Sequence, residues 1–459
     1  VQGSEAAGGL AGENLGSVQG CTTASTLTVR ANQNAGAAVG SNESGAVVSA
    51  GSYAGTVYAA SGNAGGIAGQ NAGSIADNAT VGAKVTCENG DAGGVAALNG
   101  GSISAVQVKG CTVNSGSAYM GAVAAVNNGT IQGVTVQSAA LQGDATVIGG
   151  IAGVNKGTII GTETSACTVQ PNALTLEKLT AADITLGGAA GRNEKDATIN
   201  NVQVALNVTE NLAKYRTLGG VAGENNGTLQ NCVFTAGQLG ENIASAAPAA
   251  AGAAKVGDAI GGVAGVNNRD ATVKDCTVQK IRINVLGITN VESSQDVETK
   301  LNNASHVGGI VGRNSGTIQD SKIGTDESSA VIAKFGFVGG VAGSNAGEIS
   351  GCGGKDTADA ISKIKDWLVN GKTNEMITQL KYSQDDDNES ETDSLDTAFT
   401  ALRGVDAVRD VGYTTVYTNG LTKNQLTVAL RGSATQYLQR AAGYLGGIKG
   451  FNTDTGSLS

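Results

Sequence analysis

The stretch Gly65-Gly66-Ile67-Ala68-Gly69-Gln70-Asn71 contains the pattern that decides the fold of this chain. The pattern returns at Gly93 and Gly149 and, in altered form, at Gly121, so these four copies begin 28 residues apart. Further copies begin at Gly8, Gly36, Gly187, Gly219, Gly261, Gly308, Gly339 and Gly446. Self-similarity at such a period is typical of repeat proteins in which each repeat packs only against its neighbours.

Each motif is followed by a segment that indicates more strands and a bend. After the asparagine come Gly, Ser or Thr, and an aliphatic residue, as in Gly73-Ser74-Ile75. A cysteine often stands three residues beyond that aliphatic residue, as Cys232 does beyond Leu229. Side chains alternate along a straight strand, so two inward residues three apart require a corner between them. Three short strands per repeat and no helical period predict a mainly β protein, a parallel β-solenoid (β-helix) of about a dozen rungs. At ~4.8 Å per rung the rod would be roughly 55–60 Å long.

The composition limits both the packing and the partners. The 459 residues include 71 Gly and only 3% aromatic residues, so the core must consist of small side chains on closely stacked backbone. The net charge of -10 and the lack of basic runs exclude nucleic acid from the expected partners. No apolar run approaches the roughly 20 residues that span a bilayer, so no membrane span is expected.

Changes in spacing and composition predict the domain organisation. The gap between copies grows to 107 residues from Gly339 to Gly446, and the only Trp lies inside it. We therefore predict a solenoid over residues 1–354, an inserted helical or mixed module over 355–444, and a resumed, truncated rung over 445–459. Ile361, Ile364, Trp367 and Leu368 form a helical stripe, and Leu421 to Leu438 shows a second apolar period. Since Val1 is not preceded by Met, we expect a segment of a longer chain.

The asparagine that ends each motif is the first candidate site. Stacked amides at one rung position could hydrogen-bond along the axis and cap turn backbone groups, so a structural turn ladder is expected rather than a ligand-binding row. The predicted members are Asn14, Asn71, Asn99, Asn155, Asn225, Asn267, Asn314 and Asn345. The Ser and Thr residues that follow the asparagines should form a column of hydroxyls. An ice-binding face is the alternative interpretation of this column. Glu348 argues against it, because it interrupts the column. Its members are Ser17, Ser74, Thr130, Thr158, Thr228 and Thr317.

The sequence contains few residues that could carry catalysis or bind a metal ion. The seven cysteines include no Cys-x-x-Cys pair, so we expect buried, reduced thiols. The alternative for one pair is a disulfide between Cys232 and Cys276, which neighbouring rungs could bring within range. His306 is the only histidine and is expected at a rung edge rather than in a catalytic set. The acidic run Asp385 to Asp393 lacks the EF-hand glycine, so we expect a solvated loop there. Binding of Ca²⁺ is the alternative. We expect no catalytic residue, cofactor or metal ion.

The repeated Gly-Gly-aliphatic-Ala-Gly-x-Asn motif resembles the GLUG repeat, from Gly8 to about Cys352 and again at Gly446. Such repeats resemble regions of large bacterial surface proteins, including adhesin-like proteins and proteins attached to immunoglobulin A peptidases. The resemblance implies location and architecture rather than activity. No His-Glu-x-x-His is present, so the metallopeptidase part of such proteins is not expected in this segment.

These observations lead to one expected function and one alternative. We expect a non-enzymatic, secreted, extracellular rod on a bacterial cell surface, a stalk or adhesin segment. Its partner would be an unidentified host glycan or protein, or neighbouring copies in a fibre. Recognition is expected in the inserted module, at Trp367, Tyr382, Tyr413 and Tyr417, because loops concentrate aromatic and charged side chains. The alternative is a carbohydrate-binding or polysaccharide-degrading β-helix enzyme.

Overall fold

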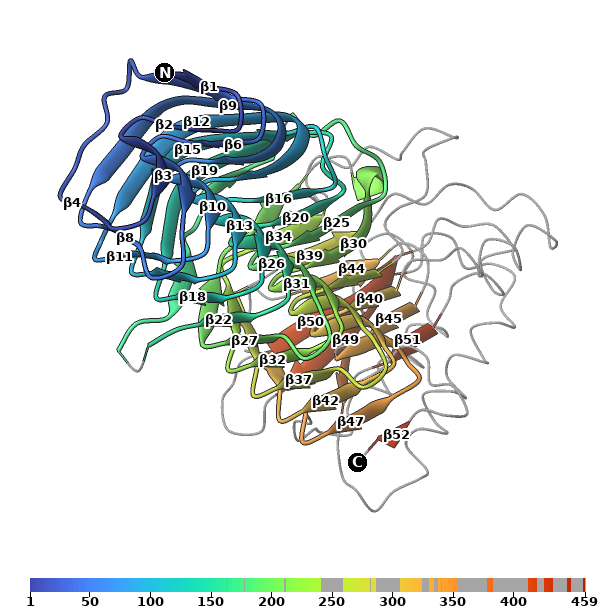
Figure 1. The fold of residues 1–459 in the computed structure, drawn as a ribbon. Helices are drawn as coiled ribbons and strands as arrows, with labels where there is room; N and C mark the ends of the chain where they lie inside the picture. The colour runs from blue at the N-terminus through green and yellow to red at the C-terminus, as the bar shows by residue number, and fades with distance from the viewer. Residues whose placement is uncertain are drawn as a thin grey trace, which may run out of the picture. The chain divides into compact units, whose positions relative to one another are not determined.

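The computed structural model describes the residues that follow: 1–162, 164–176, 178–209, 212–240, 259–280, 282–285, 306–323, 330–333, 337–339, 341–352, 378–382, 412–418, 425–431, 444–446 and 457–458. They divide into two compact units. The first unit comprises Val1–Asn207 and Thr217–Thr235, and the second Val208–Arg216 and Ala236–Ser459. Almost every described element is a β-strand, and the only described helical element is one 3-10 turn at Leu212–Lys214. Both units are parallel β-solenoids, as the repeat predicted (Figure 1).

In the first unit each turn of the chain contributes strands to three sheets. The sheet that carries the motif asparagines, here the Asn sheet, consists of β3 (Ala11–Asn14), β7 (Val39–Asn42), β10 (Ala68–Asn71), β13 (Ala96–Asn99), β17 (Ala124–Asn127), β21 (Ala152–Asn155), β26 (Ala190–Asn193) and β31 (Ala222–Asn225). The Ser/Thr sheet consists of β4 (Ser17–Gln19), β8 (Val47–Ser49), β11 (Ser74–Ala76), β14 (Ser102–Ser104), β18 (Thr130–Gln132), β22 (Thr158–Ile160), β27 (Thr198–Asn200) and β32 (Thr228–Gln230).

The third sheet, here the long-strand sheet, closes each turn. It begins with β1 (Gln2–Gly3), β2 (Ala6–Gly8), β5 (Thr28–Ala31), β6 (Asn34–Gly36), β9 (Ser52–Gly65), β12 (Thr80–Gly93), β15 (Gln107–Ser115), β16 (Tyr119–Gly121), β19 (Thr135–Gly143) and β20 (Val147–Gly149). It continues with β23 (Cys167–Val169), β24 (Leu174–Thr175), β25 (Ile184–Gly187), β28 (Val202–Val204), β30 (Tyr215–Gly219) and β33 (Val233–Thr235). Strands β9, β12, β15 and β19 run side by side in parallel (Figure 1).

The second unit repeats the three sheets. Its Asn sheet contains β36 (Ala264–Asn267), β41 (Val311–Asn314) and β46 (Ala342–Asn345), and its Ser/Thr sheet β37 (Thr272–Lys274), β42 (Thr317–Gln319), β47 (Glu348–Ser350) and β52 (Ser457–Leu458). Its long-strand sheet contains β35 (Ala259–Gly261), β38 (Thr277–Gln279), β40 (His306–Gly308), β43 (Lys322–Ile323), β45 (Phe337–Gly339) and β51 (Tyr444–Gly446). A fourth sheet contains β29 (Asn207–Val208), β34 (Gln238–Gly240), β39 (Arg282–Val285), β44 (Ala330–Ala333), β50 (Gln425–Arg431), β49 (Gly412–Thr418) and β48 (Thr378–Tyr382).

The core consists of aligned columns of small and aliphatic side chains. Val57, Val85 and Val113 occupy one register position of the long-strand sheet and are at most 1% exposed. Ile103 and Ile131 belong to a second buried column on the Ser/Thr sheet. Because parallel in-register strands stack equivalent positions, columns of Val, Ile, Leu and Ala fill most of the interior. Buried aromatic side chains, such as Tyr53 and Phe234, fill single positions.

The Gly-Gly pair is explained by close backbone contacts. A Cβ atom on Gly149, the first motif position, would overlap the carbonyl oxygen of Ala152 in the same turn. A Cβ atom on Gly150 would overlap the carbonyl oxygen of Gly188 in the next turn and lie 2.8 Å from Leu174 Cδ1. Glycine is therefore required by sterics at the first motif position, where every copy keeps it. The second position carries alanine in two copies, at Ala37 and Ala122.

The predicted corner after the Ser/Thr strand is made by one left-handed residue. Asn231 (φ 51°), Asp275 (φ 52°) and Gly351 (φ 63°) each occupy this position, directly before a cysteine. Asn, Asp and Gly are the residues that adopt positive φ most readily. The reversal redirects the chain, so the aliphatic residue and the cysteine both face inward although they are three residues apart.

The predicted domain boundaries fall partly on described residues. β51 pairs with β45, joining Tyr444 to Phe337 and Gly446 to Gly339, and β52 pairs with β47, so strands after residue 443 return to the repeat sheets. The predicted helix at Ile361–Leu368 lies outside the described residues. The described part of the stretch from Leu421 to Leu438, Gln425–Arg431, is a strand and not a helix, because its apolar residues alternate within an antiparallel pair with β49.

Candidate functional site

The asparagine column is a continuous hydrogen-bonded ladder. In the first unit each Nδ2 donates to the Oδ1 of the asparagine in the next turn, at 2.7–2.9 Å, from Asn14 to Asn225. In the second unit the same bonds join Asn267 to Asn314 at 2.8 Å and Asn314 to Asn345 at 2.7 Å. Asn14 is 6% exposed, and the other members are fully buried.

The ladder also caps the turns, as predicted. Asn127 Nδ2 donates to the carbonyl oxygens of Gly129 and Thr158, both at 3.2 Å, in addition to Asn155 Oδ1 at 2.8 Å. Oδ1 accepts from the backbone N–H of the turn glycine where Asn225 meets Gly227, at 3.3 Å. The amide thus satisfies the polar groups that the bend removes from the sheets, which buried polar groups require.

All eight predicted asparagines lie in this ladder, and three further members were missed. Asn42, Asn127 and Asn193 end copies in which alanine replaces the second glycine or the aliphatic residue: Gly36-Ala37-Ala38, Gly121-Ala122-Val123 and Gly187-Gly188-Ala189. The sequence already indicated copies at Gly36, Gly121 and Gly187, but their asparagines were not included in the predicted ladder. Requiring only the first glycine and the asparagine six residues later would have found them.

Four cysteines, Cys21, Cys232, Cys276 and Cys352, follow the left-handed corner residue, whereas Cys87 and Cys111 lie within strands of the long-strand sheet. All seven lie among the described residues and none forms a disulfide; six are buried and Cys21 is partly exposed. The thiols of Cys232, Cys276 and Cys352 donate to the carbonyl oxygen two residues earlier, at 3.2–3.3 Å. Ser321 takes the same position and makes the same bond to Gln319 at 3.0 Å. Burial raises the pKa of Cys87 and Cys111 to about 12 and of Cys167 and Cys352 to about 11, so these thiols are poor nucleophiles.

The hydroxyl column is continuous in one part of the Ser/Thr sheet. Consecutive first residues of its strands are Ser74, Ser102, Thr130, Thr158, Thr198 and Thr228. Val47 separates Ser17 from Ser74, and Glu348 follows Thr317. The next outward column is irregular, since Ala76, Ser104, Gln132 and Ile160 follow one another. A regular two-column hydroxyl lattice is therefore not formed by these strands.

Of the other residues singled out in the sequence, some lie among the described residues and some do not. His306 is the first residue of β40, in register with Ala259 and Phe337, which agrees with a rung-edge position. Tyr382 in β48 is in register with Tyr417 in β49, which also contains Tyr413. Trp367 and the acidic run Asp385 to Asp393 lie outside the described residues. Of the four predicted recognition residues, Tyr382, Tyr413 and Tyr417 are therefore placed by strand register.

A charged and aromatic group, which sequence reasoning missed, lies on the outer face of the long-strand sheet. The guanidinium carbon of Arg30 lies 4.9 Å from the centroid of the Tyr58 ring. A hydrogen bond with Glu88 raises the pKa of the Tyr58 hydroxyl. Strand register places Arg30 beside Tyr58, and Tyr58 beside Thr86, two residues before Glu88. The signal was available, because residues 30, 58 and 86 are 28 apart.

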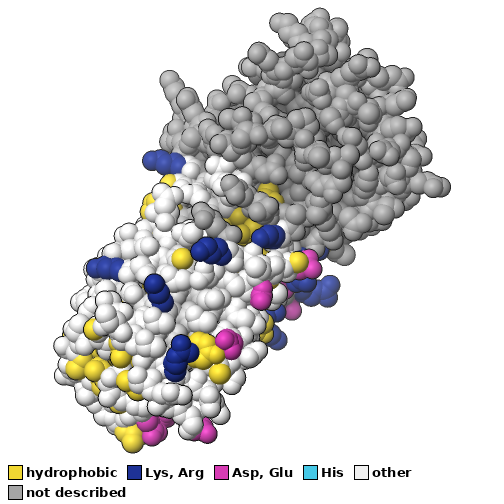
Figure 2. Space-filling model, turned by 90° about the horizontal axis from the view of Figure 1, so that it is seen from above, with side chains coloured by type: hydrophobic (Ala, Val, Ile, Leu, Met, Phe, Trp, Pro, Cys, Tyr) yellow, Lys and Arg dark blue, Asp and Glu magenta, His cyan; other side chains and the backbone are white. Residues whose placement is uncertain are grey.

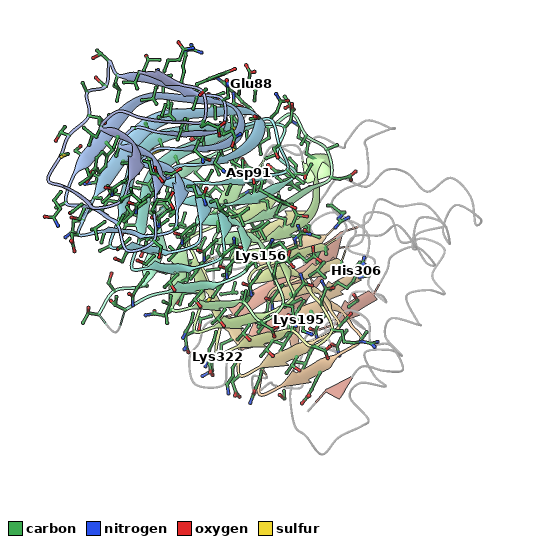
Figure 3. All side chains as sticks on the ribbon, viewed as in Figure 1. Glu88, Asp91, Lys156, Lys195, His306 and Lys322 are labelled. Atoms are coloured by element: carbon green, nitrogen blue, oxygen red, sulfur yellow. The ribbon has the colours of Figure 1, made fainter. Side chains whose placement is uncertain are left out.

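Asp91 lies on the same strand as Glu88, where that strand approaches the Gly-Gly bend (Figure 3). Burial raises the pKa of its carboxyl group, and a hydrogen bond from Ser117 Oγ to Oδ1, at 3.2 Å, partly offsets this. A carboxyl group with a raised pKa is a property of general acids, although structural carboxyl groups share it.

Comparisons with protein-family models, with curated proteins and with solved structures found no match to this chain. Among the described residues, no three His, Cys, Asp or Glu side chains lie close enough together to hold a metal ion. In that same part of the chain, no helix has the length and apolar character needed to cross a membrane.

Proposed function

We propose that this chain is a non-enzymatic structural and adhesive rod, part of a secreted bacterial cell-surface protein. The observation that supports it most is the asparagine ladder. Eight buried amides hydrogen-bond in unbroken succession from Asn14 to Asn225, so this buried polar column of the first unit holds successive turns together.

The chemistry of the outer surface fits the same proposal. Charged residues make up 15% of the chain, and the face in Figure 2 is mostly uncharged, with Lys, Arg, Asp and Glu side chains scattered singly or in small groups. Six of the seven thiols are buried, which removes the nucleophiles most reactive at neutral pH. The similarity of the motif to GLUG repeats supports the cell-surface location. Recognition by an α-rich or mixed module at 355–444 remains part of this proposal.

Deleting residues 356–443 and bridging the ends with a short Gly-Ser linker tests the proposal. The measurement is adhesion of the purified chain to host cells and to immobilised glycans. We expect a folded rod that binds less, because the pairings of β51 with β45 and of β52 with β47 need only the residues that remain. A parent chain that adheres to no cell, protein or glycan and forms no fibres would count against the adhesive role.

The second candidate function is a polysaccharide-degrading enzyme, favoured by one observation. Burial raises the pKa of the Asp91 carboxyl group, which is a property of the general acid that glycoside hydrolysis uses. Incubating the chain with polyuronides and host glycans and measuring new reducing ends tests it. Turnover that disappears in Asp91→Asn would replace the rod proposal with this one.

A further inference from the structure

We propose that the outer face of the long-strand sheet in the first unit binds a neutral glycan chain, with Tyr58 at the centre of the site. This inference rests on the adhesive function proposed above, and it names the class of ligand and a place for it. The site is the row Arg30, Tyr58, Thr86, Asn114 and Gln142, here the Tyr58 row, with Glu88 beside it.

The Tyr58 row points outward along its whole length. Its members lie on β5, β9, β12, β15 and β19 at one register position, and the residues directly before them are buried: Val29, Val57, Val85, Val113 and Leu141. Alternation therefore turns the row to the outer face. Arg30 is exposed, and the four other side chains are half-buried. Adjacent members are ~4.8 Å apart, so the row follows the solenoid axis.

The aromatic ring in this row is held from two sides. The Arg30 guanidinium lies over one face of the ring, 4.9 Å from its centroid, so the opposite face is the one offered to a sugar, and a hydrogen bond with Glu88 raises the pKa of the hydroxyl. A side chain fixed in this way loses little freedom on binding, which favours affinity. The two charges are opposite and each is engaged with Tyr58, so the pair adds no net charge to the row.

The chemistry of the row fits a sugar chain. A sugar ring presents C–H groups on its faces, which pack against an aromatic ring, and hydroxyls at its rim, which bond to amides and hydroxyls. Tyr58 supplies the apolar surface. Thr86, Asn114 and Gln142 supply donors and acceptors in the following turns. A repeated polar row along one axis matches an extended polymer of repeated units better than a compact ligand. The uncharged members favour a neutral polymer over an anionic one.

The test measures affinity of the full chain for a soluble mixed-linkage β-glucan and an α-mannan by calorimetry, with hyaluronan as the anionic comparison. We expect binding to a neutral polymer, weakened at least tenfold by Tyr58→Ala and by less than threefold by Tyr58→Phe. The matched control is Gln132→Ala, at a half-buried outward position of β18 on the Ser/Thr sheet, which should leave affinity unchanged. Asn114→Ala provides a second variant if Tyr58→Ala fails to melt like the parent.

Three results would overturn the site: no binding to either neutral polymer, binding to hyaluronan alone, or equal affinity of the parent and both row variants. Adhesion to cells that persists without any glycan binding would remove this site and leave the adhesive rod standing. Bond cleavage during the titration, seen as new reducing ends, would instead count against the rod.

Discussion

The buried asparagine of each turn makes a set of bonds that no other side chain can make in the same space. Its amide offers donors and an acceptor at once, so one residue bonds the next asparagine and caps its own turn. Aspartate lacks the donors and would bring a buried charge. Serine is too short to reach the next turn. The identity of the residue at this position therefore follows from the bonding that the bend demands.

Replacing Asn127 by Ala should destabilise the first unit by about 2–4 kcal/mol. The change leaves Asn99 Nδ2 without the Oδ1 acceptor at 2.7 Å and removes the donor that serves Asn155 Oδ1 at 2.8 Å, both in a fully buried column. Urea unfolding followed by circular dichroism measures the loss. The exposed neighbour Asn128 is the control, and Asn128→Ala should change stability by no more than about 0.5 kcal/mol. Equal effects of the two variants would contradict the role of the ladder.

A second prediction separates two glycines of one motif copy. Gly149→Ala should cost more than about 2 kcal/mol, because the added Cβ atom overlaps the Ala152 carbonyl oxygen in a bend that cannot open. Gly153→Ala should cost clearly less. Its Cβ atom would lie 2.7 Å from the Ala125 carbonyl oxygen, but the motif already carries alanine at this fifth position in Ala97 and Ala125. Thermal melting of both variants decides, and a larger loss for Gly153→Ala would refute this reading of the bend.

At the scale of the element, the corner after each Ser/Thr strand combines a left-handed residue with a small inward donor. The thiol fills the space behind the corner and donates to the carbonyl oxygen two residues earlier, as the Ser321 hydroxyl also does at Gln319. The Gln319 carbonyl oxygen accepts a backbone N–H from Asp275 as well. Burial raises the pKa of the Cys352 thiol to about 11, so this thiol stays protonated at neutral pH. The corner therefore uses cysteine for packing and hydrogen bonding rather than for its reactivity.

Stability should fall as pH rises above about 9. An unfolded thiol has a pKa near 8.5, whereas burial raises the pKa of Cys111 to about 12 in the folded chain. Between these values the folded state binds more protons than the unfolded state, so the free energy of unfolding decreases with pH. Urea unfolding at pH 8, 9 and 10 measures the slope and stays at or below the usual tyrosine pKa. Cys111→Ala should make the decline between pH 9 and 10 shallower, and parallel declines in variant and parent would contradict the prediction.

At the scale of the molecule, each solenoid is a sum of turns that contact their neighbours. Stability in such an array is approximately the sum of the turns and the contacts between successive turns, so no distant contact is needed for a turn to fold. The compact division after Thr235 falls where the chain leaves the first set of turns. The first unit contains its own core columns and its own ladder from Asn14 to Asn225.

A fragment of residues 1–235 should therefore fold on its own. We expect one cooperative urea transition, and hydrogen exchange of the backbone amides of β10, β13 and β17 as slow as in the full chain. A fragment of residues 1–207, which lacks β31, β32 and β33, should unfold at lower urea because it loses one turn of the ladder. Fast exchange throughout the longer fragment would show that the first unit depends on the rest of the chain.

The sequence alone determined the solenoid, the bends and the class of residue at each turn. These features depend on contacts within a turn or between successive turns. They therefore recur in the sequence with the 28-residue period, as Gly65 and Asn71 do, and can be predicted from it. The predicted helix within Leu421 to Leu438 failed over Gln425–Arg431, because pairing with β49 outweighs local periodicity.

The tertiary structure decided which outward side chains actually meet, because the sequence period indicates only which positions could be neighbours. Arg30, Tyr58 and Glu88 form one group because strand register stacks residues about one period apart. The period itself breaks where turns lengthen: Val136 is in register with Val169, 33 residues later. The register across such an insertion is set by hydrogen bonding and packing of the assembled turns. The surface that a ligand would meet is therefore a property of the stacked chain, whereas the core is a property of the repeat.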